Sequence, residues 1–155
     1  MLTLGIDPGW SSCGWAVNDS EKGIISSGNF VPKEKGMVNA VHNLSPSVVG
    51  VLETVFIERF VAYRGVQTSS SEDILMFIGA LQFYFLSLGL KVELTRAIDW
   101  KPKLCKWLVK NKGFSNPFPS FDKNFSLLAA KTLSGADSLT DHEADAICLS
   151  YLHDK

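Results

Sequence analysis

The chain has 155 residues, of which 46% are hydrophobic and 20% are charged, and its formal net charge is −1. This length and composition predict a single globular domain over residues 1–155. No apolar stretch approaches the ~20 residues of a membrane span, and the first residues lack the features of a secretory signal, which argues against membrane and exported proteins.

The first part of the sequence predicts an antiparallel meander. Residues 2–6 form a strand-like apolar run that ends where Asp7-Pro8-Gly9 breaks it. Two further strands are expected over residues 13–17 and 24–31, and the polar residues between them suit a hairpin turn.

The remaining sequence predicts strands that alternate with helices. After a weakly helical stretch over residues 36–53, the apolar run 55–58 suits a buried strand. A helix over 74–88 then leads to a strand over 91–95. Further helices are expected over residues 101–110, 124–133 and 141–152. This order predicts an α/β fold with a mixed five-stranded sheet, its first three strands antiparallel, flanked by helices.

Three carboxylates stand where a charge needs a partner. Asp7 and Glu58 end strongly apolar strands, and Asp145 shares its face of the last helix with apolar residues. An unpaired charge would be costly at such positions. Asp141 and His142 fall on the same side of that helix, and either could complete the set. The alternative for Asp7 and Glu58 is a strand end that already lies in water.

Oxygen ligands of this kind favour a hard divalent cation. Mg²⁺, with Mn²⁺ as a substitute, suits a carboxylate set better than zinc does. Two such ions about 3.5–4 Å apart can activate a water and stabilise the leaving oxygen of a phosphodiester. The carboxylates therefore predict phosphodiester hydrolysis.

Basic residues are concentrated in one segment. Residues 91–131 hold nine of the fifteen Lys and Arg against three acids, so this segment carries about +6 and the remainder about −7. A basic surface beside an acidic centre is what a nuclease needs, because the cations hold phosphates. A lysine-rich solvated helix would give the same pattern. Trp100 and Trp107, interleaved with the lysines, could stack on bases or pack in the core.

Three motifs span nearly the whole chain in a fixed order. They are Gly5-Ile6-Asp7-Pro8-Gly9, Ile57-Glu58-Arg59-Phe60 and Asp141-His142-Glu143-Ala144-Asp145-Ala146. Together they resemble the RuvC family of Holliday junction resolvases, especially its small members from lactococcal phages. The resemblance implies an RNase H-like fold and a homodimer whose two active sites nick opposite strands symmetrically. It also implies a Mg²⁺-dependent endodeoxyribonuclease of four-way junctions, forks and flaps, which works in the cytoplasm of a bacterial host.

The resemblance assigns roles to individual residues. Asp7, Glu58 and Asp145 match the family's catalytic, metal-binding acids. The fourth ligand commonly lies three residues before the last, which here is His142, whereas Asp141 is the acid one position away and is preferred for its charge. DNA contacts are expected from Arg59, Phe60, Tyr63, Arg64, Lys101, Lys103, Lys106, Lys110 and Lys123.

Several alternatives remain open from the sequence. An RNase H-like nuclease that processes RNA would begin with a similar motif, and a protein that binds branched DNA without cutting it would keep the same fold. The apolar stretch 74–88 suits either a dimer contact or a helix buried within the monomer.

Overall fold

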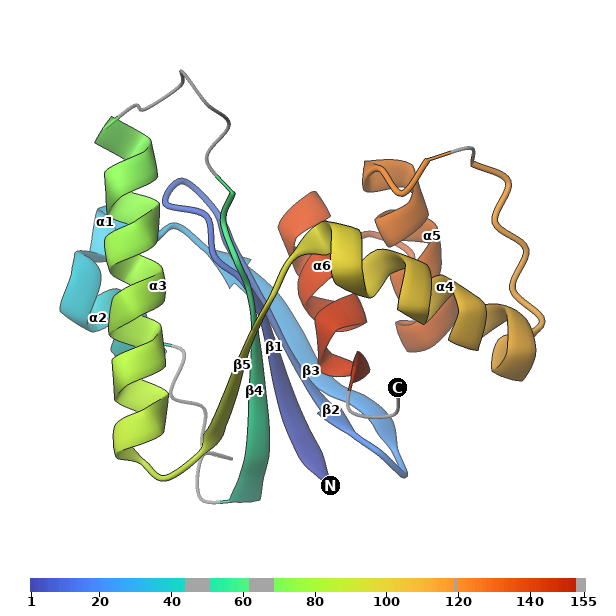
Figure 1. The fold of residues 1–155 in the computed structure, drawn as a ribbon, viewed down its shortest axis with the longest axis horizontal. Coiled ribbons are helices and arrows are strands. Elements are labelled where there is room, and N and C mark those ends of the chain that lie inside the picture. The colour runs from blue at the N-terminus through green and yellow to red at the C-terminus, as the bar shows by residue number, and fades with distance from the viewer. Residues whose placement is uncertain (44–50, 62–68, 119, 153–155) are drawn as a thin grey trace.

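The computed structural model describes residues 1–43, 51–61, 69–118 and 120–152. Five strands form one sheet in the order β3-β2-β1-β4-β5 (Figure 1). Strand β2 (Cys13–Asp19) pairs antiparallel with both β1 (Leu2–Asp7) and β3 (Gly23–Phe30). Strand β4 (Leu52–Glu58) runs parallel to β1, and β5 (Lys91–Thr95) runs parallel to β4. The expected mixed five-stranded sheet is confirmed.

Helices cover both faces of this sheet (Figure 1). Helices α1 (Pro32–Lys35), α2 (Met37–Asn43) and α3 (Ser69–Ser87) lie on one side, and α4 (Ala97–Lys112), α5 (Lys123–Ser134) and α6 (Asp141–Ser150) lie on the other. The alternation of side chains along β1 and β4 explains the two layers. Leu4 and Ile57 pack against α3 in one core, while Phe56 packs with α4 and α6 in the other. None of the described helices is long and apolar enough to cross a membrane.

Helix α6 lies close to the sheet because two glycines leave room for its backbone. A Cβ atom on Gly5 would collide with the carbonyl oxygen of Ala146, and one on Gly14 with that of His142. The far end of α6 is fixed by hydrogen bonds to the Ser150 carbonyl, which accepts from the Thr3 hydroxyl at 2.5 Å and from Asn18 Nδ2 at 3.2 Å. Glycine at the sheet surface therefore sets the depth of the helix that carries Asp145.

The starts of helix α4 and strand β4 differ from expectation. Helix α4 begins at Ala97, four residues before the expected residue 101, because the carbonyl of Arg96 already accepts the N–H groups of Asp99 and Trp100. Pro102 consequently lies inside the helix. Strand β4 begins at Leu52, within the stretch expected to be weakly helical, and α2 accounts for the earlier part of that stretch.

Candidate functional site

The carboxyl ends of two adjacent parallel strands carry Asp7 and Glu58. The register of β1 and β4 pairs Ile6 with Ile57, so the next residues along each strand, Asp7 and Glu58, emerge at the same edge of the sheet. Pro8 follows Asp7 and ends its strand. The expected placement of both acids at strand ends is therefore observed, and neither is fully in water.

Helix α6 brings His142 to Asp7. The Nδ1 atom of His142 lies 2.6 Å from Oδ2 of Asp7, and the side chains are 41% and 14% exposed. This hydrogen bond raises the pKa of His142 above its ordinary value, and the charges of Asp7, Asp145 and Asp141 add to the effect although burial opposes it. The contact of Asp7 with His142 would therefore be replaced if the Asp7 carboxylate bound a divalent cation or a proton.

Asp145 lies against a buried lysine. The Nζ atom of Lys101 is 3.1 Å from Oδ1 of Asp145, and the two side chains are only 9% and 16% exposed. The angles of this contact are not those of a hydrogen bond, and among the described residues Oδ1 of Asp145 accepts none with regular geometry. Burial raises the pKa of Asp145, the ammonium of Lys101 opposes that shift, and the charge of Asp7 adds to it. The ammonium therefore compensates part of the negative charge of the site.

Glu58 accepts a hydrogen bond from a buried tryptophan. The indole Nε1–H of Trp100 donates to Oε2 of Glu58 at 2.9 Å. Burial, followed by the charges of Asp7 and Asp145, raises the pKa of Glu58 to about 7, although Trp100 and Lys101 oppose the shift. Additional positive charge nearby would therefore stabilise the ionised form of Glu58.

The residue types at this edge fit a hard divalent cation. Three carboxylates interact electrostatically here, and Asp145 offers an oxygen without an aligned hydrogen bond. Their side chains do not surround a common point, since no three His, Cys, Asp or Glu side chains among the described residues form such a group. Each carboxylate is instead engaged by a protein partner: Asp7 by His142, Glu58 by Trp100 and Asp145 by Lys101.

Asp141 forms an ion pair with a surface lysine. Its Oδ2 lies 2.6 Å from the Nζ of Lys123, at the surface, with side-chain exposures of 41% for Asp141 and 77% for Lys123. His142, one residue along α6, is the side chain that contacts Asp7.

The other residues expected to contact DNA are distributed as follows. Lys103, Lys106 and Lys110 are exposed along α4, Arg59 is exposed, and Phe60 is partly buried. Lys101 is buried on Asp145 instead of lying at the surface. Tyr63 and Arg64 lie outside the described residues.

Sequence reasoning missed the partners of the carboxylates. Trp100 packs in the core, one of the two expected roles, and it also donates to Glu58 at the end of β4. Lys101 was expected to bind phosphate, yet it contacts Asp145 of α6. The available signal was their adjacency, since a polar indole N–H and an ammonium in one helical turn can serve neighbouring buried acids. Trp107 packs against Tyr151, with ring centroids 6.1 Å apart.

Comparison with known proteins identifies the fold. No protein-family model and no curated protein matches the sequence. The structure is similar to RuvC of Thermus thermophilus, with a TM-score of 0.63 and 19% identity over 97% of this chain and 91% of that one. A second structure, of T. thermophilus RuvC with a Holliday junction substrate, gives 0.62 and 20% over 97% and 90%. The fowlpox virus Holliday junction resolvase gives 0.52 and 14% over 99% of both chains. The chain therefore has the RNase H-like fold that these proteins share.

Proposed function

We propose that this protein is a metal-dependent endonuclease that hydrolyses phosphodiesters in branched DNA and resolves Holliday junctions. The observation that carries the proposal is that Asp7 and Glu58 end adjacent strands, with Asp145 of α6 near enough to raise the pKa of Glu58, beside a helix with an exposed row of lysines. The fold shared with T. thermophilus RuvC, which is known in complex with a Holliday junction substrate, supports the choice of substrate. Forks and flaps are further expected substrates, and we infer that the protein acts in the cytoplasm of a bacterial host.

The proposed ligands of Mg²⁺ or Mn²⁺ are Asp7, Glu58, Asp145 and His142. Bound divalent ions would activate a water and stabilise the leaving oxygen of the phosphodiester. His142 is preferred to Asp141 as the fourth ligand because it already contacts Asp7, whereas Asp141 is paired with Lys123. These donors are hard, which suits either metal.

The chain's own residues prepare the site for this charge. Trp100 fixes one oxygen of Glu58 through its indole N–H, and Lys101 keeps Asp145 partly neutralised while the site is metal-free. Because both come from the same turn of α4, the position of this helix controls the orientation of two of the three acids. We therefore assign Lys101 to the acidic site and not to the DNA-binding surface.

DNA binding is assigned to the exposed face of α4. Lys103, Lys106 and Lys110 follow a spacing of three and four residues, which places them on one side of a helix. Exposed cations in a row bind successive phosphates without reading sequence. Arg59, just after β4, lines a hollow together with Lys103, and Lys123, at the start of α5, is a further exposed cation that we assign to DNA binding.

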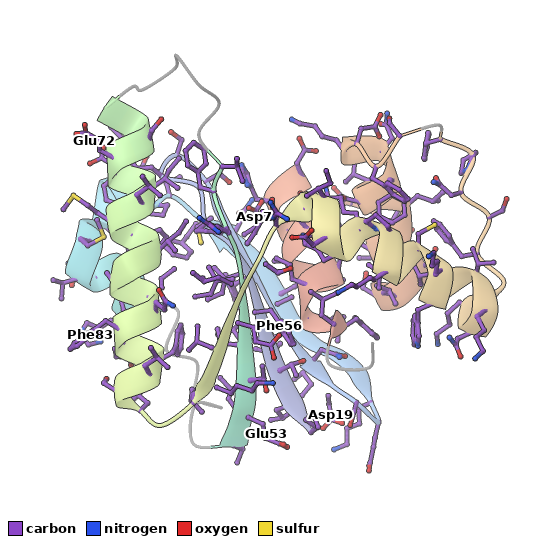
Figure 2. The ribbon with its side chains drawn as sticks, viewed as in Figure 1. Asp7, Asp19, Glu53, Phe56, Glu72 and Phe83 are labelled. Atoms are coloured by element: carbon purple, nitrogen blue, oxygen red, sulfur yellow. The ribbon has the colours of Figure 1, made fainter. Side chains whose placement is uncertain are left out.

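We further propose a homodimer that forms through α3. Phe77, Leu81 and Phe85 of this helix are buried against the sheet, so its outward face is free for another contact. That face carries the apolar side chains Met76, Phe83 and Leu86, which are 65%, 76% and 54% exposed (Figure 2 shows Phe83). Gly79, between them, has open space around its Cβ position and would admit a partner helix. A two-fold axis through α3 would give the two active sites that paired incision requires.

The deciding experiment is cleavage of end-labelled DNA. Four-way junctions, forks, flaps, linear duplex and a structured RNA are incubated with the protein in Mg²⁺, Mn²⁺, Ca²⁺ or EDTA. We expect symmetric nicks in the four-way junction with Mg²⁺ or Mn²⁺, and none with EDTA or in the Asp7→Asn variant. Cleavage confined to RNA, or junction binding without cleavage in any metal, would contradict the proposal.

A further inference from the structure

An open groove leads from Glu58 over the carboxyl ends of β4 and β5. It consists of two hollows of about 490 and 690 Å³ that share Arg59, Arg96 and Ile98. Glu58 lines the first hollow and Lys103 lines the second. Its lining includes Thr95, the last residue of β5, and Ala97, the first residue of α4. Figure 1 shows where β5 passes into α4. A ligand in the groove would therefore touch both the acidic site and the basic helix.

The outer part of the groove is positively charged and retains unused hydrogen-bond donors. Among the described residues that line it, Arg59, Arg96 and Lys103 face one carboxylate, that of Asp99. Arg96 binds Asp99 side-on, with Nε at 2.7 Å from Oδ2 and Nη2 at 3.1 Å from Oδ1. A guanidinium has five N–H donors, so this pair leaves three for another acceptor. The Asp99 carboxylate therefore orients the Arg96 guanidinium and leaves three of its N–H donors available.

The backbone fixes Arg96 relative to the acidic site. Arg96 is the N-cap residue of α4, and its carbonyl accepts the N–H of Trp100 at 3.2 Å. Trp100 in turn donates to Glu58, and the N–H of Arg59 donates to the carbonyl of Thr95 at 2.8 Å. Arg59 and Arg96 thus follow the ends of the adjacent strands β4 and β5. Arg96 is also one helical turn from Trp100, the side chain that contacts Glu58.

Apolar side chains lie between these cations. Ile98 is 76% exposed and Val61 is 52% exposed, and both line the groove. Alternating apolar and cationic surface matches a nucleotide chain, in which sugars and bases alternate with phosphates. A free phosphate ion would use the cations and leave the apolar side chains exposed.

We propose that this groove binds the DNA strand on one side of the scissile phosphate, and that Arg96 holds a neighbouring phosphate of that strand. The inference rests on the proposed function, since it assumes a DNA substrate. It adds a contact that the sequence did not reveal and gives the Arg96–Asp99 pair a role in positioning the strand.

The test combines protein variants with neutral phosphates in the DNA. Binding to a four-way junction is measured in Ca²⁺ across a series of salt concentrations, for wild type, Arg96→Ala and Arg96→Lys. Lys22→Ala, in the exposed turn at the opposite end of the sheet, is the matched control. Each junction carries a methylphosphonate at one position near the cleavage site, and thermal unfolding confirms that every variant is folded.

We expect Arg96→Ala to bind about tenfold more weakly, with a salt slope shallower by about 0.9, and Lys22→Ala to bind like wild type. Arg96→Lys should fall between Arg96→Ala and wild type, because it keeps the charge but loses the fork of donors. At one position, the methylphosphonate should weaken junction binding by wild type and should not weaken binding by Arg96→Ala any further. Unchanged junction binding by Arg96→Ala would overturn the groove assignment. So would affinity losses from Arg96→Ala and from the methylphosphonate that add up at every methylphosphonate position.

The binding assay also separates the two proposals. If wild type binds junctions but does not cut them in any metal, the nuclease proposal fails while the methylphosphonate pattern still decides the groove. Weakened binding of inorganic phosphate by Arg96→Ala, with unchanged binding of the junction, would mean that the groove takes a free anion, and would refute the strand proposal.

Discussion

His142 Nδ1 lies 2.6 Å from Oδ2 of Asp7, across the interface between α6 and the first strand. Its neighbour Asp141 is instead paired with Lys123 at the surface, which is why we propose His142 as the fourth ligand. We therefore expect His142→Ala to reduce the rate of junction nicking by more than about tenfold, and Asp141→Asn by less than about threefold. Single-turnover nicking rates in Mg²⁺ measure both. A larger loss of nicking rate in Asp141→Asn than in His142→Ala would make Asp141 the fourth metal ligand in place of His142.

The three acids should be required for cleavage and not for binding. Asp7→Asn, Glu58→Gln and Asp145→Asn should each slow nicking by at least about a thousandfold, since each removes a group that acts on the reacting phosphate. Junction affinity should change little, because cations on α4 and around Arg59 supply most of it. Gel-shift binding in Ca²⁺ and nicking in Mg²⁺ are measured on the same preparations. Retained Mg²⁺-dependent nicking by Asp7→Asn would refute the site.

Metal-free stability should depend on the ionisation of Glu58. Its folded pKa of about 7 exceeds the ordinary value of 4.5, so the folded protein binds this proton more tightly than the unfolded chain does. Stability should therefore fall as the pH rises from 4.5 through 7. Glu58→Gln removes the buried charge and should be more stable than wild type at pH 8 by up to about 3 kcal/mol, with little difference near pH 5.

Thermal unfolding in EDTA at several pH values measures this difference. Glu53→Gln is the matched control, because Glu53 is exposed on the same strand (Figure 2), and it should leave stability within about 0.5 kcal/mol of wild type. Added Mg²⁺ should stabilise wild type more than Glu58→Gln. A Glu58→Gln variant that is less stable than wild type at pH 8 in EDTA would contradict the raised pKa.

The outward face of α3 should hold two subunits together. Sedimentation of wild type should report about 34 kDa, twice the 17.0 kDa of the chain. Phe83→Lys should yield a folded monomer because its side chain is 76% exposed and contributes little to the monomer core. Val109→Lys, an equally drastic change at an exposed position of α4, should remain dimeric. A wild-type monomer at micromolar concentration that still makes paired cuts would refute the dimer.

A mixed dimer tests whether the two sites act separately. One wild-type subunit paired with one Glu58→Gln subunit should nick a single strand of the junction and fail to resolve it. Product analysis on denaturing and native gels distinguishes these outcomes. Full resolution by the mixed dimer would show that one active site makes both cuts.

The close approach of α6 to the sheet should be sensitive to a single methyl group. Gly5→Ala would press its Cβ onto the backbone of α6, 2.6 Å from the nitrogen of Ser150, and we expect it to lose about 1–3 kcal/mol of stability. Gly28→Ala is the control, because its Cβ would meet only the Trp15 ring, at 3.3 Å, which can shift. Urea unfolding compares them. Equal stabilities for the two variants would mean that α6 is not seated by Gly5.

The sequence alone determined the sheet and two of the acids. Strand periodicity and the Pro8-Gly9 break are local properties, so they predicted that Asp7 and Glu58 each end an apolar strand. The pairing of these two strands came from the structure. Apolar neighbours likewise indicated that Asp145 faces the protein and needs a partner. The choice between Asp141 and His142 lay beyond such reasoning, because adjacent residues of a helix differ by only about 100° and both fit the inward side.

Tertiary structure decided the partners of the acids. The rotation of α6 is set by its contact with Gly5 and Gly14, and this rotation directs His142 to Asp7. Within α4, Trp100 and Lys101 are buried, where a surface lysine had been expected. The apolar sequence of α3 could not show which of its faces meets the sheet, since hydrophobicity carries no direction until a second surface is present. Residues far apart in sequence share these contacts, and only the packed chain fixes their relative orientation.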